Sequence, residues 1–121
     1  MQSQVSTNAA LTPVFENGAA LTRYSASAVV PASVDFIKAT GGAAGIALTL
    51  TPMIYPTGSP GSPTFLYSVY YAMKDDAAAG AVSFIDPNGA MFNGQSSYEL
   101  TDQYQWAIFC WDGIGWHVLG N

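Results

Sequence analysis

Residues 104–111 read YQWAIFCW, and they are followed by DGIG at 112–115 and WHVL at 116–119. The first eight residues carry no charge and are mostly aromatic, β-branched or small, a composition that favours a pleated strand over a helix. Asp-Gly supplies residues that tolerate positive φ, and a second apolar run follows, so the segment predicts a β-hairpin. Its turn is either a four-residue loop or a two-residue turn with a bulge at Gly115.

Both faces of this strand are mostly apolar. Side chains alternate across a strand, so Trp106, Ile108 and Cys110 point one way and the residues between them the other. A strand in a small antiparallel sheet usually buries one face and exposes the other to water. We therefore expect one face to pack in the subunit's own core and the other against something else. The residues that we assign to the core or subunit interface, without deciding which face is which, are Tyr98, Trp106, Ile108, Phe109, Trp111 and Trp116.

The composition predicts one domain that associates with other subunits. The chain has 121 residues, of which 50% are hydrophobic and only 9% are charged, against about 25% charged in an average soluble domain. A monomer of this size exposes roughly 6,000 Å², which three basic and eight acidic residues cover sparsely. Uncharged Ser, Thr, Asn, Gln and Gly are the alternative covering. We expect an obligate oligomer whose partner subunits cover much of the surface.

Several function classes do not fit the sequence. The net charge is −5, and Arg23, Lys38 and Lys74 are the only basic residues, so no basic patch for nucleic acid is expected. No run of 18 apolar residues predicts a membrane helix, and residues 1–8 lack the features of a signal peptide. The single cysteine, Cys110, has no partner for an internal disulfide, and we interpret it as a small buried hydrophobic residue.

Residues 1–18 fit neither a helical stripe nor a clean strand. They are polar, with isolated apolar residues at Val5, Leu11, Val14 and Phe15. We interpret this segment as an extended N-terminal arm. Chain ends usually fray unless something holds them, so we expect a partner to bind the arm through these four residues.

The remainder, residues 19–121, predicts a single all-β domain. Residues 52–63 hold four prolines and form a long surface loop rather than a domain linker, because neither side alone has enough strands for a stable sheet. Turn signals at 86–89 and 93–94 separate short strands, and no segment predicts an amphipathic helix. We expect an antiparallel β-sandwich or jelly-roll-like domain. Besides the hairpin, the expected strands are 21–30, 34–38, 46–51, 64–74, 81–85, 90–92 and 97–100.

No residue pattern predicts an enzyme, a cofactor site or a metal site. His117 is the only histidine, and we expect it at a subunit or solvent boundary rather than as the base for Cys110. Asp75 and Asp76 are interpreted as part of a solvated loop. Asp86 lies in a turn that lacks the bidentate glutamate of a calcium loop. Exposed aromatic residues stack on sugars in some proteins, but at strand spacing they are more often core or interface.

Several segments, in order along the chain, resemble a β-rich module of bacteriophage virion-surface proteins. They are Val34–Ile37, Ile46–Leu50, Tyr71–Asp75, Val82–Asp86, Phe92–Tyr98, and the closing Trp111-Asp112-Gly113 with Trp116–Leu119. The resemblance covers about residues 34 to 120. It implies a protein of the tail-fibre, tailspike or head-decoration type, which form homotrimers. The chain departs from that pattern in its long Pro-rich loop and in lacking the shaft of a fibre.

The resemblance and the composition together predict a capsid decoration, or cement, protein. We expect a homotrimer on the outer surface of the assembled capsid of a virion put together in the host cytoplasm. Its partners would be further copies of itself and the major capsid protein, which the arm would clamp. Binding only to the assembled shell would stabilise that shell, and three arms would add avidity. The alternatives are a tail-fibre or receptor- and glycan-binding virion protein, and a tail-tube or baseplate subunit.

Overall fold

The computed structural model describes residues 20–52 and 68–121, in which every regular element is a β-strand. The expected arm, with Val5, Leu11, Val14 and Phe15, and almost all of the Pro-rich loop lie outside these residues. The strands are β2 (Leu21–Tyr24), β3 (Ala28–Val30), β4 (Phe36–Ala39), β5 (Ile46–Leu50), β6 (Ser68–Lys74), β7 (Val82–Ile85), β8 (Tyr98–Leu100), β9 (Trp106–Trp111) and β10 (Trp116–Gly120). The prediction of an all-β fold is confirmed for the described residues.

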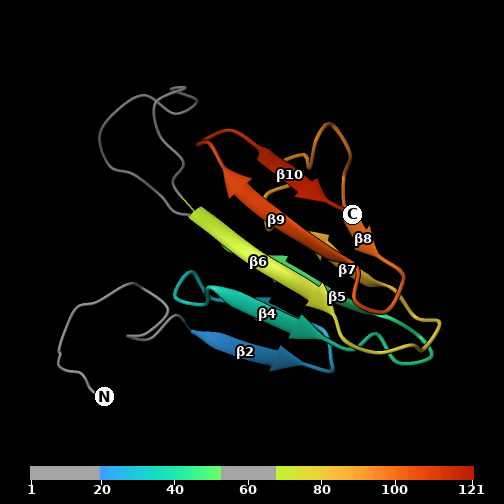
Figure 1. The fold of residues 1–121 in the computed structure, drawn as a ribbon. Helices are drawn as coiled ribbons and strands as arrows, with labels where there is room; N and C mark the ends of the chain where they lie inside the picture. The colour runs from blue at the N-terminus through green and yellow to red at the C-terminus, as the bar shows by residue number, and fades with distance from the viewer. Residues whose placement is uncertain (1–19, 53–67) are drawn as a thin grey trace, which may run out of the picture.

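The strands form two mixed sheets rather than purely antiparallel ones (Figure 1). A five-stranded sheet has the order β10-β9-β6-β4-β2, and a four-stranded sheet has the order β3-β5-β7-β8. Strand β4 pairs in parallel with β2 and β6, and β5 pairs in parallel with β3 and β7. Only the pairs β6–β9, β9–β10 and β7–β8 are antiparallel. The expectation of an antiparallel domain was therefore wrong.

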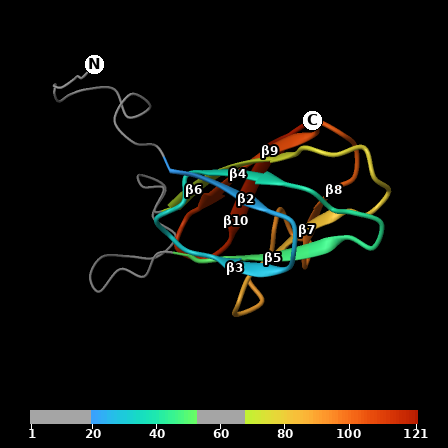
Figure 2. The same ribbon diagram turned by 90° about the horizontal axis from the view of Figure 1, so that it is seen from below.

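The parallel pairs follow from the path of the chain. From β2 to β7, successive strands alternate between the two sheets, which form two layers in Figure 2. Every second strand therefore returns to the same sheet in the same direction. Parallel neighbours usually need a helical crossover, but here a strand of the opposite sheet makes the connection. The single strand expected at 21–30 is correspondingly two strands, β2 and β3, in different sheets.

A single aromatic core lies between the two sheets. Phe109 of β9 is fully buried, and its ring centroid lies 4.5 Å from that of Phe84 on β7. Phe92 and Tyr98 pack edge-on against the same ring, with centroid distances of 5.9 and 5.7 Å. Because these rings come from both sheets, the inner face of β9 holds the two layers together.

The turns of the C-terminal half form at the expected residues. The β9–β10 connection is a four-residue loop, because Trp111 pairs with Trp116 and the Asp112 amide donates to the Gly115 carbonyl at 3.2 Å. Gly113 has a φ of 99°, which glycine adopts without strain. At the second turn, Asn93 and Gly94 have φ values of 50° and 84°, as a type I′ turn requires.

Residues 90–92 do not form the predicted strand. Phe92 instead makes isolated bridges to Gln95 and to Trp116 of β10. The side chain of Asn93 then pairs with the backbone of Val118: its Oδ1 accepts from the amide and its Nδ2 donates to the carbonyl, both at 2.9 Å. This pairing covers the outer edge of β10, which would otherwise expose unpaired backbone groups.

The loop after β6 is anchored by a buried cation. Lys74 is fully buried, and its Nζ donates to Asp76 Oδ1 at 2.7 Å and to the carbonyls of Asp76 and Ala78 at 2.7 and 2.9 Å. The carboxylate of Asp76 also accepts from the amides of Gly41 and Gly42 at 3.1 and 3.0 Å. The prediction of a solvated loop is thus incomplete, because Asp76 joins two connections that lie 34 residues apart in sequence.

Candidate interaction surface

Strand β9 separates the core from a second apolar surface. Its residues alternate as predicted: Ala107, Phe109 and Trp111 are buried, whereas Trp106 is exposed and Ile108 is partly exposed. The outward residues of β9 continue onto β6 and β10, with which it pairs, and from β6 onto β4 and β2. We call this side of the five-stranded sheet the outer face.

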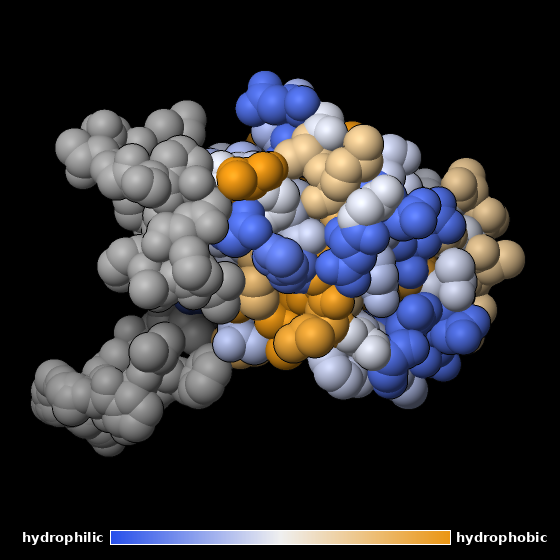
Figure 3. Space-filling model, turned by 90° about the horizontal axis from the view of Figure 1, so that it is seen from above, coloured by the Kyte–Doolittle hydropathy of each residue, from blue (hydrophilic) through white to orange (hydrophobic). Residues whose placement is uncertain are grey.

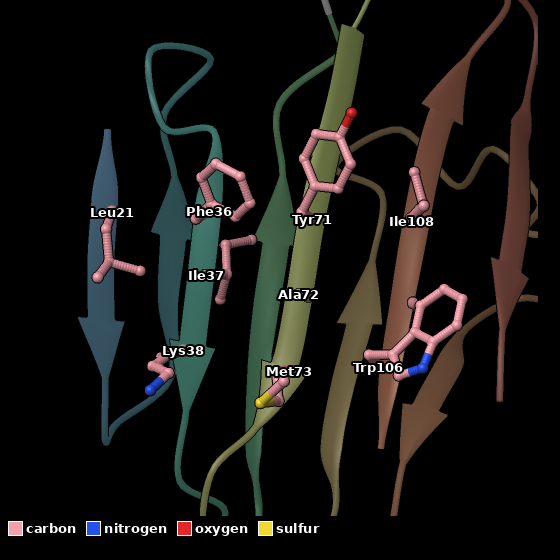
Figure 4. A pocket seen from close by; sticks show the side chains of 10 residues that line it. Leu21, Phe36, Ile37, Lys38, Tyr71, Ala72, Met73, Trp106 and Ile108 are labelled. Carbon is pink, nitrogen blue, oxygen red and sulfur yellow. The ribbon is translucent and has the colours of Figure 1, made fainter. Parts of the chain in front are cut away.

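One row of large apolar side chains crosses the whole outer face. In the strand register, Leu21 is the partner of Phe36, Phe36 of Tyr71, Tyr71 of Ile108, and Ile108 of Leu119. Figure 4 shows the first four side by side on neighbouring strands. We call these five residues the apolar row. It takes one residue from each strand of the sheet, so only the assembled register brings it together.

The apolar row is accessible to a partner. The exposed fractions are 49% for Leu21, 38% for Tyr71 and 63% for Leu119. The rings of Phe36 and Tyr71 stack with centroids 5.0 Å apart, which fixes the middle of the row. Beside it, Met73 and Trp106 help to line a shallow apolar hollow of about 240 Å³. Contiguous exposed apolar surface of this kind marks interaction sites in soluble proteins.

Seen from above, the molecule shows an orange hydrophobic area at its lower centre, with hydrophilic residues to the right of it (Figure 3). Met73 and Trp106 form a second cross-strand row on the outer face, which continues through Lys38 to Arg23. On the opposite side of the apolar row, Val69 pairs with Cys110. Apolar residues therefore flank the row on both sides in the middle of the sheet.

The basic end of the outer face lies on β2 and β4. Arg23 and Lys38 are direct cross-strand partners, and because Lys74 is buried they are the two basic side chains left at the surface. Like charges opposite each other repel. Lys38 Nζ lies 3.9 Å from Asp75 Oδ1, and no ion pair within the described residues involves Arg23.

The outer side of the four-stranded sheet has a different composition. Two of its cross-strand rows pair Val29 with Thr49 and Ile85, and Ala47 with Ser83 and Glu99. These residues are mostly small or polar, and the row of large apolar side chains has no counterpart there. Of the two sheets, the five-stranded one therefore presents the surface suited to a partner.

The hairpin brings together the side chains that resemble a nucleophile and its base. His117 is the cross-strand partner of Cys110, and its Nε2 donates to Asp112 Oδ2 at 2.5 Å. Burial raises the pKa of the Cys110 thiol, whereas a nucleophilic cysteine needs a lowered pKa. The arrangement therefore gives no physical support for a reactive thiolate.

The Asp112 carboxylate stabilises the four-residue loop between β9 and β10. Its partial burial opposes ionisation, but hydrogen bonds from the Gly115 amide, the His117 ring and the Ile114 amide outweigh burial and lower its pKa. The two backbone bonds to Oδ1 are 2.8 and 2.9 Å long. Asp112 thus holds the four-residue loop in shape and orients His117 at the end of the outer face.

The part of the chain that the structure describes holds neither a cluster of metal ligands nor a membrane-spanning helix. Within residues 20–52 and 68–121, no three or more His, Cys, Asp or Glu side chains gather in a way that would hold a metal ion. In the same part of the chain, no helix is long and apolar enough to cross a membrane.

The structure distributes the six predicted core or interface residues between the two sides of the sheet. Phe109, Trp111 and Trp116 are buried, and Tyr98 packs against that core. Trp106 and Ile108 lie on the outer face. No local sequence signal singles out the other members of the apolar row. Alternation places Tyr71 on one face of its strand, but only the register between strands shows which residues lie beside it. These other members are Leu21, Phe36, Tyr71 and Leu119.

Comparison with known proteins adds no family. No protein-family model matches this sequence, and no curated protein matches it either.

Proposed function

We propose that this chain is a non-enzymatic structural protein of a bacteriophage virion, a capsid decoration protein that binds the outer surface of the assembled shell as a homotrimer. In this proposal the two layers are a β-sandwich of the virion-surface type, preceded by an arm over residues 1–18. The observation that carries the proposal is the apolar row, because five large apolar side chains on an outer sheet face call for a covering partner.

Three further features support a structural role. Surface charge is sparse, with 9% charged residues, as expected when other subunits cover much of the surface. The ion pair between the buried Lys74 and the partly exposed Asp76, and the side-chain hydrogen bonds of Asn93, fix connections between strands in place. The sequence resembles modules of head-decoration and tail-fibre proteins over about residues 34 to 120.

Linkage gives the mechanism of stabilisation. A protein that binds the assembled shell, but not its separated subunits, lowers the free energy of the shell by its own binding free energy. Contact with the major capsid protein is assigned to the arm, through Val5, Leu11, Val14 and Phe15. A trimer carries three arms, so the second and third arms bind at a high effective concentration.

The test is attachment to capsids that were assembled without this protein. Purified protein is mixed with such particles and with intact tails, and occupancy on each is measured by sedimentation and electron microscopy. We expect saturable binding to heads and a higher temperature of capsid opening. Binding to tails alone would overturn the decoration proposal and favour a tail location.

A glycan-binding tail-fibre protein is the second candidate. The feature that favours it is the partly exposed indole of Trp106, 39% exposed, beside the apolar hollow, because sugar rings stack on such surfaces. A glycan array separates the two candidates. Binding that the Trp106→Ala variant loses would support the tail-fibre candidate, and an array without signal would count against it.

A further inference from the structure

We propose that the outer face of the five-stranded sheet is the interface between copies of this chain, in a closed ring with the apolar row lying along the threefold axis. The number three rests on the proposed function. The assignment of the face rests on the strand register. Each copy would then direct Leu21, Phe36, Tyr71, Ile108 and Leu119 toward the axis, where the three rows would form one apolar core.

The direction of the apolar row sets the geometry of the ring. The row crosses the strands, so an axis along it is perpendicular to the strands. Rotation about such an axis leaves the position of each strand along the axis unchanged. The residues on one side of the apolar row in one copy therefore meet the residues of the same strand on the other side of the row in the next copy. This is a heterologous contact that closes into a ring.

The flanking residues suit this contact. On β9, Trp106 of one copy would meet Cys110 of the next, and on β6, Met73 would meet Val69. All four are apolar or weakly polar, as the core of an obligate interface requires.

The first experiment measures the oligomeric state by sedimentation at micromolar concentration. The variants are Tyr71→Lys and Leu119→Lys, each of which would place three ammonium groups close to the axis. The matched control is Val29→Lys, because Val29 is 66% exposed but lies on the outer side of the other sheet. Circular dichroism and thermal melting establish that each variant is folded.

We expect the wild type and Val29→Lys to be trimers and the two row variants to be folded monomers. Folded row variants that remain trimeric would overturn the inference, since the interface would then lie elsewhere. A monomeric wild type would also overturn it. Capsid attachment is measured separately, so failure of the interface and failure of the decoration function give different results: a monomer that still decorates heads refutes only the interface.

The second experiment uses Cys110 as a reporter, because it is the chain's single cysteine. In Trp106→Cys, the two thiols of one chain lie four residues apart on one strand, roughly 13 Å, too far for an internal disulfide. Oxidation with diamide should link copies and give a ladder that ends at the covalent trimer. The double variant Trp106→Cys, Cys110→Ser should give no covalent trimer.

A ladder that stops at the dimer would mean twofold packing of two outer faces and would refute the ring. If Trp106→Cys fails to assemble, Met73→Cys combined with Val69→Cys and Cys110→Ser tests the same contact from β6. Absence of cross-links in both variants, with trimers still present, would also refute the proposed contact.

Discussion

At the residue scale, two side chains illustrate how burial decides a role. Lys74 is a cation without solvent contact, and its ammonium group is satisfied by one carboxylate oxygen and two carbonyls. Its hydrogen bond to Asp76 is the main cause that lowers the pKa of Asp76 to about 2, with help from the amides of Gly42 and Gly41. The ion pair therefore stabilises the fold only while Asp76 is ionised.

The Asp76→Asn variant should be less stable than the wild type at neutral pH, because a buried ammonium would lose its counter-ion. The pKa of Asp76 falls from 3.8 to about 2 on folding. The stabilisation is therefore complete above pH 3.8 and is lost as the pH falls toward 2. The melting temperature of the wild type should fall through this window more steeply than that of Asp76→Asn. Parallel melting curves for the two proteins between pH 5 and pH 2 would contradict this assignment.

Trp106 and Phe109 lie on the same strand, but their replacement by alanine should lower the free energy of unfolding by different amounts. Phe109→Ala removes a fully buried ring and should cost about 3–5 kcal/mol of folding free energy. Trp106→Ala removes a ring that is 39% exposed and should cost less than about 2 kcal/mol in a monomer. Urea unfolding is measured in the Tyr71→Lys background, in which the proposed interface between copies would be disrupted, so that folding is measured without assembly. Equal losses of unfolding free energy for the two variants would show that the Trp106 indole packs in the core of the subunit.

At the element scale, the edge strand β10 is closed by a side chain rather than by another strand. Asn93 makes two hydrogen bonds to the backbone of Val118, and its own amide donates to the Trp116 carbonyl at 3.0 Å. Trp116 in turn donates from its indole to the buried carboxylate of Asp86 at 2.9 Å. Strand β10 is thereby fixed on the side that does not face β9.

Replacement of Asn93 should loosen this edge. Asn93→Gly keeps the positive φ accessible but removes both side-chain bonds, and should cost about 1–3 kcal/mol. Asn93→Ala should cost more, because alanine disfavours the left-handed conformation. Asn88→Ala is the control, since Asn88 is exposed in the 86–89 turn. Thermal melting with amide exchange at Val118 measures the effect. Unchanged protection of Val118 in Asn93→Gly would show that the side-chain pair is dispensable.

At the scale of the whole molecule, the described strands begin at Leu21 and so lie after the proposed arm. The amide of Ala20, the first described residue, donates to Asp35 Oδ2 at 3.0 Å. Removal of residues 1–18 would remove none of the described strands, from β2 to β10. The proposed arm and the described strands can therefore be tested separately.

Deletion of residues 1–18 should leave a folded trimer and sharply weaken attachment to undecorated capsids. Burial of the four apolar side chains of the proposed arm on the shell would favour attachment. The second and third arms of a trimer would bind at a high effective concentration, so three arms together should hold the protein more firmly than one. Occupancy on capsids is compared with that of the full-length protein. Equal occupancy would place the contact on the body, and loss of the trimer would mean that the arm joins subunits.

Sequence alone determined the all-strand character, the hairpin of residues 104–119 and the alternation of Trp106, Ile108 and their buried neighbours along one strand. These features depend on residues within a few positions of each other, through β propensity, the two-residue period and turn residues such as Asn93-Gly94. The same local signals indicated that both faces of this strand are apolar, whereas a strand of a solitary subunit usually exposes one polar face to water.

Only the tertiary structure decided the parallel pairing, the division of residues 21–30 between two sheets, the burial of Lys74 and the identity of the outer face. Each depends on which strands lie side by side and in what register, and a shift of one residue would turn every side chain to the other face. Leu21 and Leu119 lie at opposite ends of the chain, yet the register places them in one row. The row is a property of all five strands together, because each strand contributes a single residue to it.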